Sequence, residues 1–330
     1  MHPRFLFLSL LILIVLLAAC DPFAPVVTPT AVTIIVTPSA SDTPVPTSTQ
    51  PPTVTPRPTD TPAPTPTATA LACLSTGGQI IPFDEFRSPS AGENLRYRVY
   101  IPPCYLESQR RFPVIYLLPG EGENESQWDE LGVDAAVDQG VRLGAVPPMI
   151  VVMPALGSIG ARDSFPPNAS YETYLMDELR PAVERDFCTI TTRAQRAVGG
   201  IGRGGFWAYS LALRHPDTFS IVGGHSADFE VSNIPPANNP LELALDAPFL
   251  QQANLRMFID NGADDPFGAG LGTFSSRLSA RGITHTYVIT PGEAHDERYW
   301  SAQIDEYLSF YSEGWTRDLG ALPSCLEPSP

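Results

Sequence analysis

The sequence contains no lysine, because all 20 of its basic residues are arginines. This absence excludes a Schiff-base lysine, the lysine of a phosphate-binding P-loop and a serine–lysine catalytic pair. Acidic residues outnumber the basic ones, and the formal net charge is −16. An acidic surface repels phosphate backbones and no basic run interrupts it, so we expect no nucleic-acid partner.

Cysteine is scarce, and none of the 5 cysteines stands in a C-x-x-C pair. This scatter argues against a metal site, and we expect neither a metal nor a cofactor. Besides Cys20, which is treated below, an even number of cysteines remains, which favours one or two disulfides in an exported protein. Four cysteines allow three pairings. We favour Cys73 with Cys325, which bracket the folded region, and Cys104 with Cys188.

The apolar run near the start, from Phe5 to Leu17, is too short to cross a bilayer comfortably. It follows a short segment with one arginine, and small residues lead from it to Cys20. This pattern resembles a bacterial lipobox, and we predict a signal peptide over residues 1–20 with Cys20 as the lipidated membrane anchor. The protein is then extracytoplasmic. An ordinary secretory signal with an incidental cysteine is the alternative interpretation.

Residues 21–72 are dominated by Thr, Pro, Ala, Val and Ser. This composition cannot bury a core, and its prolines favour an extended polyproline conformation. We predict a disordered tether here rather than a ligand for proline-binding domains. A single globular domain is expected over residues 73–330.

The folded part alternates strand-like and helix-like patterns. Short apolar runs predict strands at Tyr97–Ile101, Val114–Leu118, Met149–Met153, Arg196–Ile201, Arg256–Asp260 and Thr286–Ile289. Helical spacing predicts helices over 134–143, 172–185, 204–214, 270–281 and 300–311. Such alternation is typical of an α/β fold with a mostly parallel sheet and helices on both faces. Active sites of these folds form at the carboxyl ends of the strands.

A glycine-rich turn follows the strand at Arg196–Ile201. Residues 200–204 have the form of the nucleophile elbow G-x-S-x-G, with Gly202 where the serine would stand. The centre of such an elbow costs a non-glycine residue about 1–3 kcal/mol of backbone strain, which glycine avoids. Glycine also deletes the hydroxyl. A phosphate-binding loop and a plain tight turn are the other interpretations of this segment.

Two later turns carry candidates for an acid and a base. Asp265 lies in a carboxylate-rich turn after a predicted strand, and His295 lies in the loop before the last predicted helix. The order elbow, acid, histidine is that of the α/β-hydrolase triad. Asp264 and Asp260 compete with Asp265 for the position of the acid.

The domain resembles the esterase family of the α/β-hydrolase superfamily that includes feruloyl and acetylxylan esterases, esterase D and the mycolyltransferases. The resemblance covers about residues 94–311 and rests on the elbow and on motifs at 100–103, 112–120, 171–173, 213–216, 262–265 and 292–295 before Trp300. It implies an α/β-hydrolase fold and an ester ligand. It also implies position 202 as nucleophile, Asp265 as acid and His295 as base.

A second departure from that family's pattern lies after the strand Val114–Leu118. The family has His-Gly where this chain has Pro119-Gly120, and proline donates no backbone hydrogen bond. Donors to an oxyanion would come from the backbone at Gly120 and Glu121 and from the amide of Arg203. The Glu121 carboxylate has the wrong sign to stabilise an oxyanion. Ser226 follows the next strand and could border the pocket as a substitute nucleophile, but it has no elbow.

We therefore predict an anchored domain that binds an acyl, aryl or carbohydrate ester with impaired catalysis. Arg203, beside the glycine-opened floor, could hold a carboxylate or phosphate of the ligand. One alternative is an active carboxylic ester hydrolase in which His295 and Asp265 activate water, or in which another residue serves as nucleophile. The other is a purely structural envelope protein, whose pocket would be filled by side chains.

Overall fold

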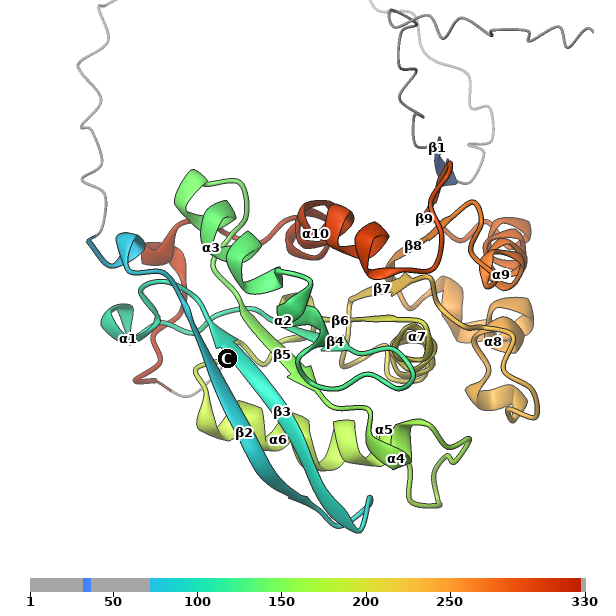
Figure 1. The fold of residues 1–330 in the computed structure, drawn as a ribbon, viewed down its shortest axis with the longest axis horizontal. Coiled ribbons are helices and arrows are strands. Elements are labelled where there is room, and N and C mark those ends of the chain that lie inside the picture. Colours follow the sequence, from blue (N-terminus) through green and yellow to red (C-terminus); the bar gives the residue numbers. More distant parts are fainter. Residues whose placement is uncertain (1–31, 37–71, 328–330) are drawn as a thin grey trace, which may run out of the picture.

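The computed structural model describes residues 32–36 and 72–327. The predicted signal peptide, the predicted lipidation at Cys20 and most of the predicted tether lie outside the described residues. Within the region predicted as a tether, Val32–Val36 form strand β1, which pairs antiparallel with strand β9 (His285–Thr290) (Figure 1). No helix within the described ranges has the length and apolar character needed to span a membrane.

The described residues form a nine-stranded sheet in the order β1-β9-β8-β7-β6-β4-β5-β3-β2 (Figure 1). Neighbours from β5 through β4 to β9 are parallel, and β1, β2 and β3 pair antiparallel. The expected mostly parallel sheet is confirmed. The remaining strands are β2 (Gln79–Ser88), β3 (Glu93–Ile101), β4 (Val114–Leu118), β5 (Ile150–Pro154), β6 (Arg196–Ile201), β7 (Ile221–His225), β8 (Arg256–Gly262) and β9 (His285–Thr290).

Helices cover both faces of the sheet, as expected (Figure 1). The α-helices are α1 (Tyr105–Ser108), α2 (Gln127–Glu130), α3 (Val133–Leu143), α4 (Gly157–Gly160), α5 (Tyr171–Thr173), α6 (Arg180–Asp186), α7 (Arg203–Arg214), α8 (Pro240–Asp246), α9 (Gly268–Ala280) and α10 (Glu297–Ser312). A π-helical stretch, η2 (Tyr174–Leu179), joins α5 to α6. Short 3₁₀ turns lie at Ala72–Ser75, Arg193–Gln195, Pro236–Asn238, Pro248–Gln251 and Leu319–Ala321. Every predicted strand and helix overlaps one of these elements.

Strand β4 shows how the two faces divide the core. All five of its residues are buried. Because side chains alternate along a strand, Val114 and Tyr116 join the core beneath α5, α6 and α7, whereas Ile115 and Leu117 join the core beneath α3 and α10. A continuous apolar run is what a central parallel strand needs, since both of its faces pack against helices.

The predicted strands do not include β2 or β7. Strand β2 lies at the sheet edge and contains Pro82, which interrupts a strand pattern but is tolerated where no neighbour needs the amide. Strand β7 contains Gly223, which also weakens the pattern. A β-carbon at Gly223 would lie 2.0 Å from the hydroxyl of Tyr311, and one at Gly199 would lie 1.7 Å from the same atom. These glycines make room for that tyrosine of α10.

The four cysteines outside the predicted signal peptide form two disulfides, but the favoured pairing is wrong. Cys73 pairs with Cys104, and Cys188 pairs with Cys325, with Cα–Cα distances of 5.0 and 5.6 Å. The C-terminal segment also runs beside the loop before β4, where the amide of Arg111 donates to the carbonyl of Pro323. The Cys188–Cys325 disulfide therefore ties the C-terminal segment to the middle of the folded region.

Candidate active site

The glycine-rich turn at the end of β6 is held by very close packing. Gly202 stands between β6 and α7 with φ 51° and ψ −114°. A β-carbon at Gly204 would lie 2.4 Å from the carbonyl oxygen of Leu118, and one at Gly200 would lie 2.3 Å from the carbonyl carbon of Gly204. No side chain fits at 200 or 204, so the strand, turn and helix meet as the elbow pattern requires.

Position 202, in contrast, has room for a small side chain. The nearest atoms to a β-carbon built there are Cε1 and Nε2 of His295, at 3.6 and 3.7 Å, which is ordinary van der Waals contact. The backbone of Gly202 is fixed: its amide donates to the carbonyl of His225 at 3.0 Å, and its carbonyl accepts from the amide of Asp228 at 3.0 Å. The site is therefore shaped for a small side chain at position 202 that points at the histidine.

His295 is paired with Asp265. Nδ1 of His295 lies 3.3 Å from both carboxylate oxygens of Asp265, whose side chain is buried. The rings of Phe267 and Trp300 stand edge-on to the imidazole at 4.9 and 4.8 Å. The imidazole is thus clamped, with Nδ1 on the carboxylate and Nε2 toward Gly202.

Asp265 is an anion at neutral pH. Burial by itself would raise its pKa, but hydrogen bonds from His295, from Ser226 and from the amide of Phe267 outweigh that effect, and the pKa is lowered. Of its competitors for the position of the acid, Asp264 is exposed and Asp260 lies in a separate buried network. Asp265 is the one of the three that contacts His295.

The amides expected to receive an oxyanion are only partly free. The amide of Gly120 donates to Oε1 of Gln127 at 2.8 Å, so this donor is occupied. Across the described residues, the amides of Glu121 and Arg203 donate to no protein acceptor. Sequence reasoning missed Gln127, because it is the turn between β4 and α2 that brings its side chain to the amide of Gly120.

The guanidinium of Arg203 is occupied by the protein itself. Its Nε donates to the carbonyl of Gly160 at 3.1 Å, and its Nη2 lies 2.6 Å from the carboxylate of Asp163. The guanidinium also stacks over the ring of Phe206 at 4.6 Å. This geometry does not support the expected contact between Arg203 and an anionic ligand.

Ser226 lies beneath the site rather than beside it. It is fully buried, and its hydroxyl accepts from Nε1 of Trp300 at 3.0 Å. It also hydrogen-bonds Asp265. Its position does not fit the expectation of a substitute nucleophile at the pocket wall. Ser226 instead orients the acid and one of the aromatic rings that clamp His295.

A cavity of ≈ 520 Å³ opens above Gly202. A purely structural role predicts a filled pocket, and this open cavity speaks against that alternative. The lining residues include most of the predicted site, but Ser226 and Asp265 do not reach it. They are Gly120, Glu121, Glu123, Gln127, Ile201, Gly202, Arg203, Asp228, Phe267, His295, Asp296, Glu297, Arg298 and Trp300.

A second histidine–aspartate pair, which sequence reasoning missed, lies buried behind the elbow. Nδ1 of His225 is 2.7 Å from the Asp260 carboxylate, and Nε2 is 2.8 Å from the hydroxyl of Tyr311. The other oxygen of Asp260 accepts from Tyr299 at 2.6 Å and from Tyr307 at 2.7 Å. Because the carbonyl of His225 accepts from the Gly202 amide, this network supports the turn on which the site is built.

Most of the folded part of the chain is similar to known esterases. A family model described as "Putative esterase" matches residues 88–311. An endo-1,4-beta-xylanase/feruloyl esterase of Xylanibacter ruminicola is 33% identical over 150 residues, which cover 42% of this chain and 20% of that protein. An esterase of Mycobacterium tuberculosis is 32% identical over 147 residues, or 43% of this chain and 31% of that protein. The match thus spans less than a third of either curated relative.

Solved structures show the same fold over the domain. A ferulic acid esterase is 25% identical with a TM-score of 0.65, and the alignment covers 72% of this chain and 98% of that one. An S-formylglutathione hydrolase from Staphylococcus aureus is 17% identical with a TM-score of 0.58, covering 72% and 99%, and shows the fold alone. Because the family model matches more than half of this chain, the chain belongs to the "Putative esterase" family, and it has the α/β-hydrolase fold.

Proposed function

We propose that this chain is an esterase-family domain in which Gly202 stands in place of the serine nucleophile, so that the pocket binds an ester without hydrolysing it through an acyl-enzyme. One observation carries this proposal. The acid–base pair is assembled, yet the position whose β-carbon would lie 3.7 Å from Nε2 of His295 is a glycine.

The chemistry of the triad gives the expected consequence. His295 would take a proton from a nucleophile and Asp265 would stabilise the resulting imidazolium, but Gly202 offers no proton and no attacking oxygen. Removal of the nucleophile from a well-studied serine hydrolase costs on the order of 10⁶ in turnover. Binding does not need that hydroxyl, so the pocket keeps its affinity while it loses catalysis.

The ligand proposed is an ester with an aryl, acyl or carbohydrate group. Phe267 and Trp300 line the cavity beside His295 and offer apolar ring surface to such a group. Two of the similar solved structures are feruloyl or ferulic acid esterases in complex with sinapinate and with ferulic acid. An aryl ester of the ferulate type is therefore the first ligand to test.

We also propose that the domain lies outside the cytoplasm on a lipid anchor at Cys20, with residues 21–72 as its tether. The lipobox-like sequence supports the anchor, and the two disulfides fit an oxidising compartment. Labelling of cells with a palmitate analogue tests it: the parent should incorporate the label and Cys20→Ser should not.

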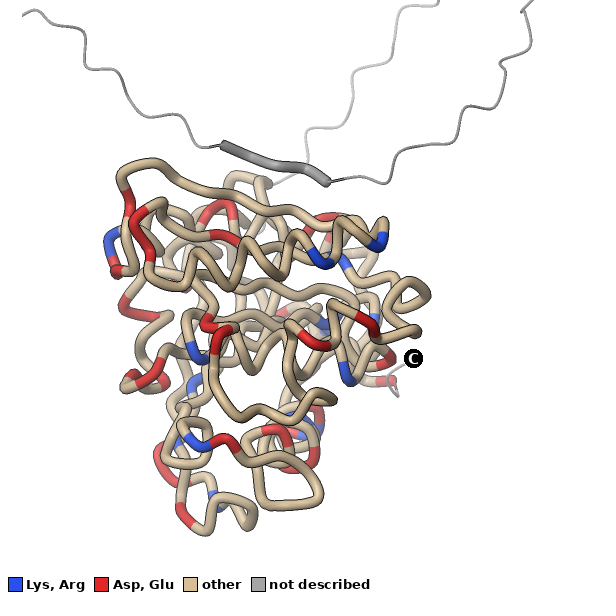
Figure 2. Tube along the Cα trace, turned by 90° about the vertical axis from the view of Figure 1, so that its right-hand side faces the viewer, with Lys and Arg blue, Asp and Glu red and all other residues tan. Residues whose placement is uncertain are grey.

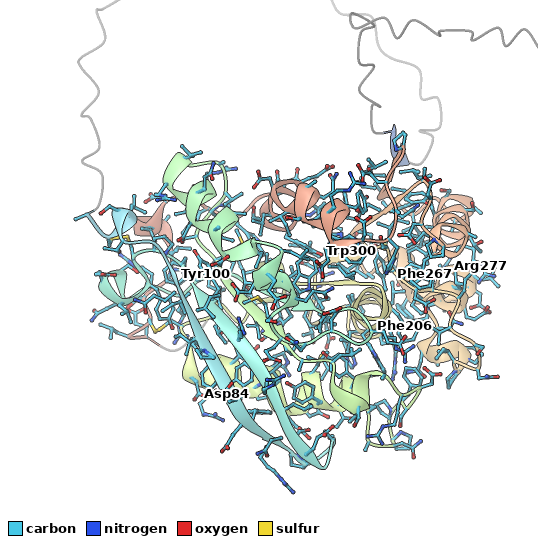
Figure 3. All side chains as sticks on the ribbon, viewed as in Figure 1. Asp84, Tyr100, Phe206, Phe267, Arg277 and Trp300 are labelled. Carbon is cyan, nitrogen blue, oxygen red and sulfur yellow. A yellow bond between two sulfur atoms is a disulfide. The ribbon has the colours of Figure 1, made fainter. Side chains whose placement is uncertain are left out.

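Titration calorimetry with methyl ferulate, run beside a turnover assay on the same ester, tests the proposed function. We expect saturable binding by the parent, with hydrolysis no faster than that of His295→Ala. Phe267→Ala should weaken binding by removing one wall of the cavity. Asp84→Asn, an exposed change on β2 far from Phe267 in Figure 3, should bind like the parent.

The same experiment decides on a second candidate, hydrolysis by a water molecule that His295 activates. The lack of a side chain at Gly202 favours this candidate, because a water could take the place of a β-carbon that would lie 3.7 Å from Nε2 of His295. Turnover by the parent that His295→Ala abolishes would establish it and overturn the proposal of binding alone.

A further inference from the structure

The cavity above Gly202 is rimmed by carboxylates that have no arginine partner. Glu121 and Glu123 come from the loop after β4, Asp228 follows β7, and Asp296 and Glu297 stand at the start of α10. Among the ion pairs of the described residues, none includes any of these five. Three different segments thus place negative charge around one opening.

The two arginines that line the cavity do not offset this charge. Arg203 is held by Asp163 at 2.6 Å, and Arg298 is held by Glu293 at 2.6 Å. Both partner carboxylates lie outside the cavity lining, so the charge of each arginine is offset by a residue that does not line the cavity. No other arginine is among the lining residues, and the chain contains no lysine.

Asp228 is partly buried in the wall of the cavity. Burial, above all, and the nearby negative charge of Glu121 raise its pKa despite the presence of Arg203. The guanidinium of Arg203 acts to lower that pKa, but its effect is smaller than that of burial. Figure 2 shows that acidic positions also recur across the face of the molecule turned to the viewer in that picture.

We propose that this site selects its ligand by charge: it binds an ester bearing a cationic group, such as a quaternary ammonium, more tightly than a neutral ester, and a neutral ester more tightly than a free carboxylate. The inference rests on the proposed function, since it concerns the ligand of that pocket. Opposite charges attract across the few ångströms of a partly desolvated cavity.

This preference distinguishes the chain from two of its solved neighbours, whose structures hold ferulic acid and sinapinate. Those ligands carry a carboxyl group. In this chain, the rim carboxylates would repel the negative charge of the free acid, whereas the ester group of the same compound carries no charge to be repelled. The site would therefore retain an ester and release the corresponding acid.

Titration calorimetry with three ligands that share one feruloyl group tests the proposal: feruloylcholine, methyl ferulate and ferulate. At low salt we expect dissociation constants that rise about tenfold at each step in that order. At high salt the steps should shrink, since ions screen charges at the opening of the cavity. The double variant Glu121→Gln/Glu123→Gln should reduce each step to about threefold, because it removes two of the five carboxylates that line the cavity. Asp84→Asn, remote and equally acidic, should leave the order unchanged.

The outcomes separate this inference from the proposed function. Equal affinities for all three ligands, or tightest binding of ferulate, would overturn selection by charge and leave ester binding in place. Loss of the order in Asp84→Asn as well as in the double variant would assign it to net charge rather than to this site, and would overturn it too. Failure of the parent to bind any of the three would overturn both proposals.

Discussion

A β-carbon at Gly202 would stand 3.7 Å from Nε2 of His295. A hydroxyl one bond further out would come within hydrogen-bond reach of that nitrogen, about 2.6–3.2 Å, which is the spacing of a nucleophile and its base. Since Nδ1 of His295 already faces Asp265, one side chain separates this site from a complete triad.

Gly202→Ser is therefore predicted to create esterase activity. We expect hydrolysis of a chromogenic acetyl or feruloyl ester at least about 10²-fold above the parent, because the variant restores the attacking oxygen whose loss is the costliest in such sites. The change should lower the free energy of unfolding by about 1–3 kcal/mol, since φ at this position is positive. Steady-state kinetics and chemical denaturation measure the two effects.

Gly202→Ala is the matched control, because it carries the same backbone strain without the hydroxyl. It should lose the same stability and gain no activity. A folded Gly202→Ser protein that stays inactive would locate the defect at the oxyanion donors, where Gln127 occupies the amide of Gly120 and Pro119 has none.

Asp260→Asn is predicted to destabilise the domain by about 3–5 kcal/mol, a lowering of the melting temperature by roughly 6–20 °C. The Asp260 carboxylate accepts hydrogen bonds from Tyr299 and Tyr307 and pairs with His225, and all four residues are buried. An asparagine has one oxygen to accept with, so buried donors are left unpaired. Thermal unfolding measures the change. The exposed Asp264→Asn should shift it little, and equal shifts in both variants would contradict the role given to the network.

The architecture of this site could be predicted because its signals are local. Each apolar strand leads directly into the turn that carries a functional residue, and parallel strands bring those turns to one edge of the sheet. Gly202, Asp265 and His295 follow β6, β8 and β9 in that way. Only the structure shows that Asp265, rather than Asp260 or Asp264, contacts His295. The sequence does not show where each of three carboxylates within six positions points.

The contacts that could not be predicted join distant segments. Arg203 meets Asp163 across 40 positions, and His225 meets Asp260 across 35, because crossover connections place their strands and loops side by side. The disulfide pairing failed for the same reason. A sequence carries no Cα–Cα distance, and bracketing of the domain by Cys73 and Cys325 does not bring those two residues together.

The disulfides are predicted to contribute unequally to stability. The bridge Cys188–Cys325 spans 137 positions and the bridge Cys73–Cys104 spans 31. Since the loop entropy removed from the unfolded chain grows with loop length, loss of the longer bridge should cost about 1 kcal/mol more, on a base of about 2–4 kcal/mol. Denaturant unfolding of the two double serine variants measures this difference. Peptide mapping without reduction should find both pairs, and a Cys73–Cys325 peptide would contradict the connectivity.

Glu172 should make part of the stability depend on pH. Its carboxylate is buried, and it accepts from Arg214 at 2.6 Å and contacts Nε2 of His215 at 2.7 Å. Burial would raise its pKa, but these partners together lower it. A carboxyl with a lowered folded pKa stabilises the fold above its unfolded pKa of about 4.3, and that contribution is lost as pH falls through the folded value.

Glu172→Gln is therefore predicted to be about 1–3 kcal/mol less stable than the parent at neutral pH, because it leaves the Arg214 charge without its carboxylate. The difference should stay constant down to about pH 4.5 and narrow below about pH 4, where the parent loses its advantage. Denaturant unfolding across this range measures it. Glu242→Gln removes an exposed partner of Arg277 at 3.4 Å and should change stability by less than about 1 kcal/mol at every pH. A difference for Glu172→Gln that persisted unchanged far below pH 4 would show that lost packing, rather than lost charge, is what the substitution measures.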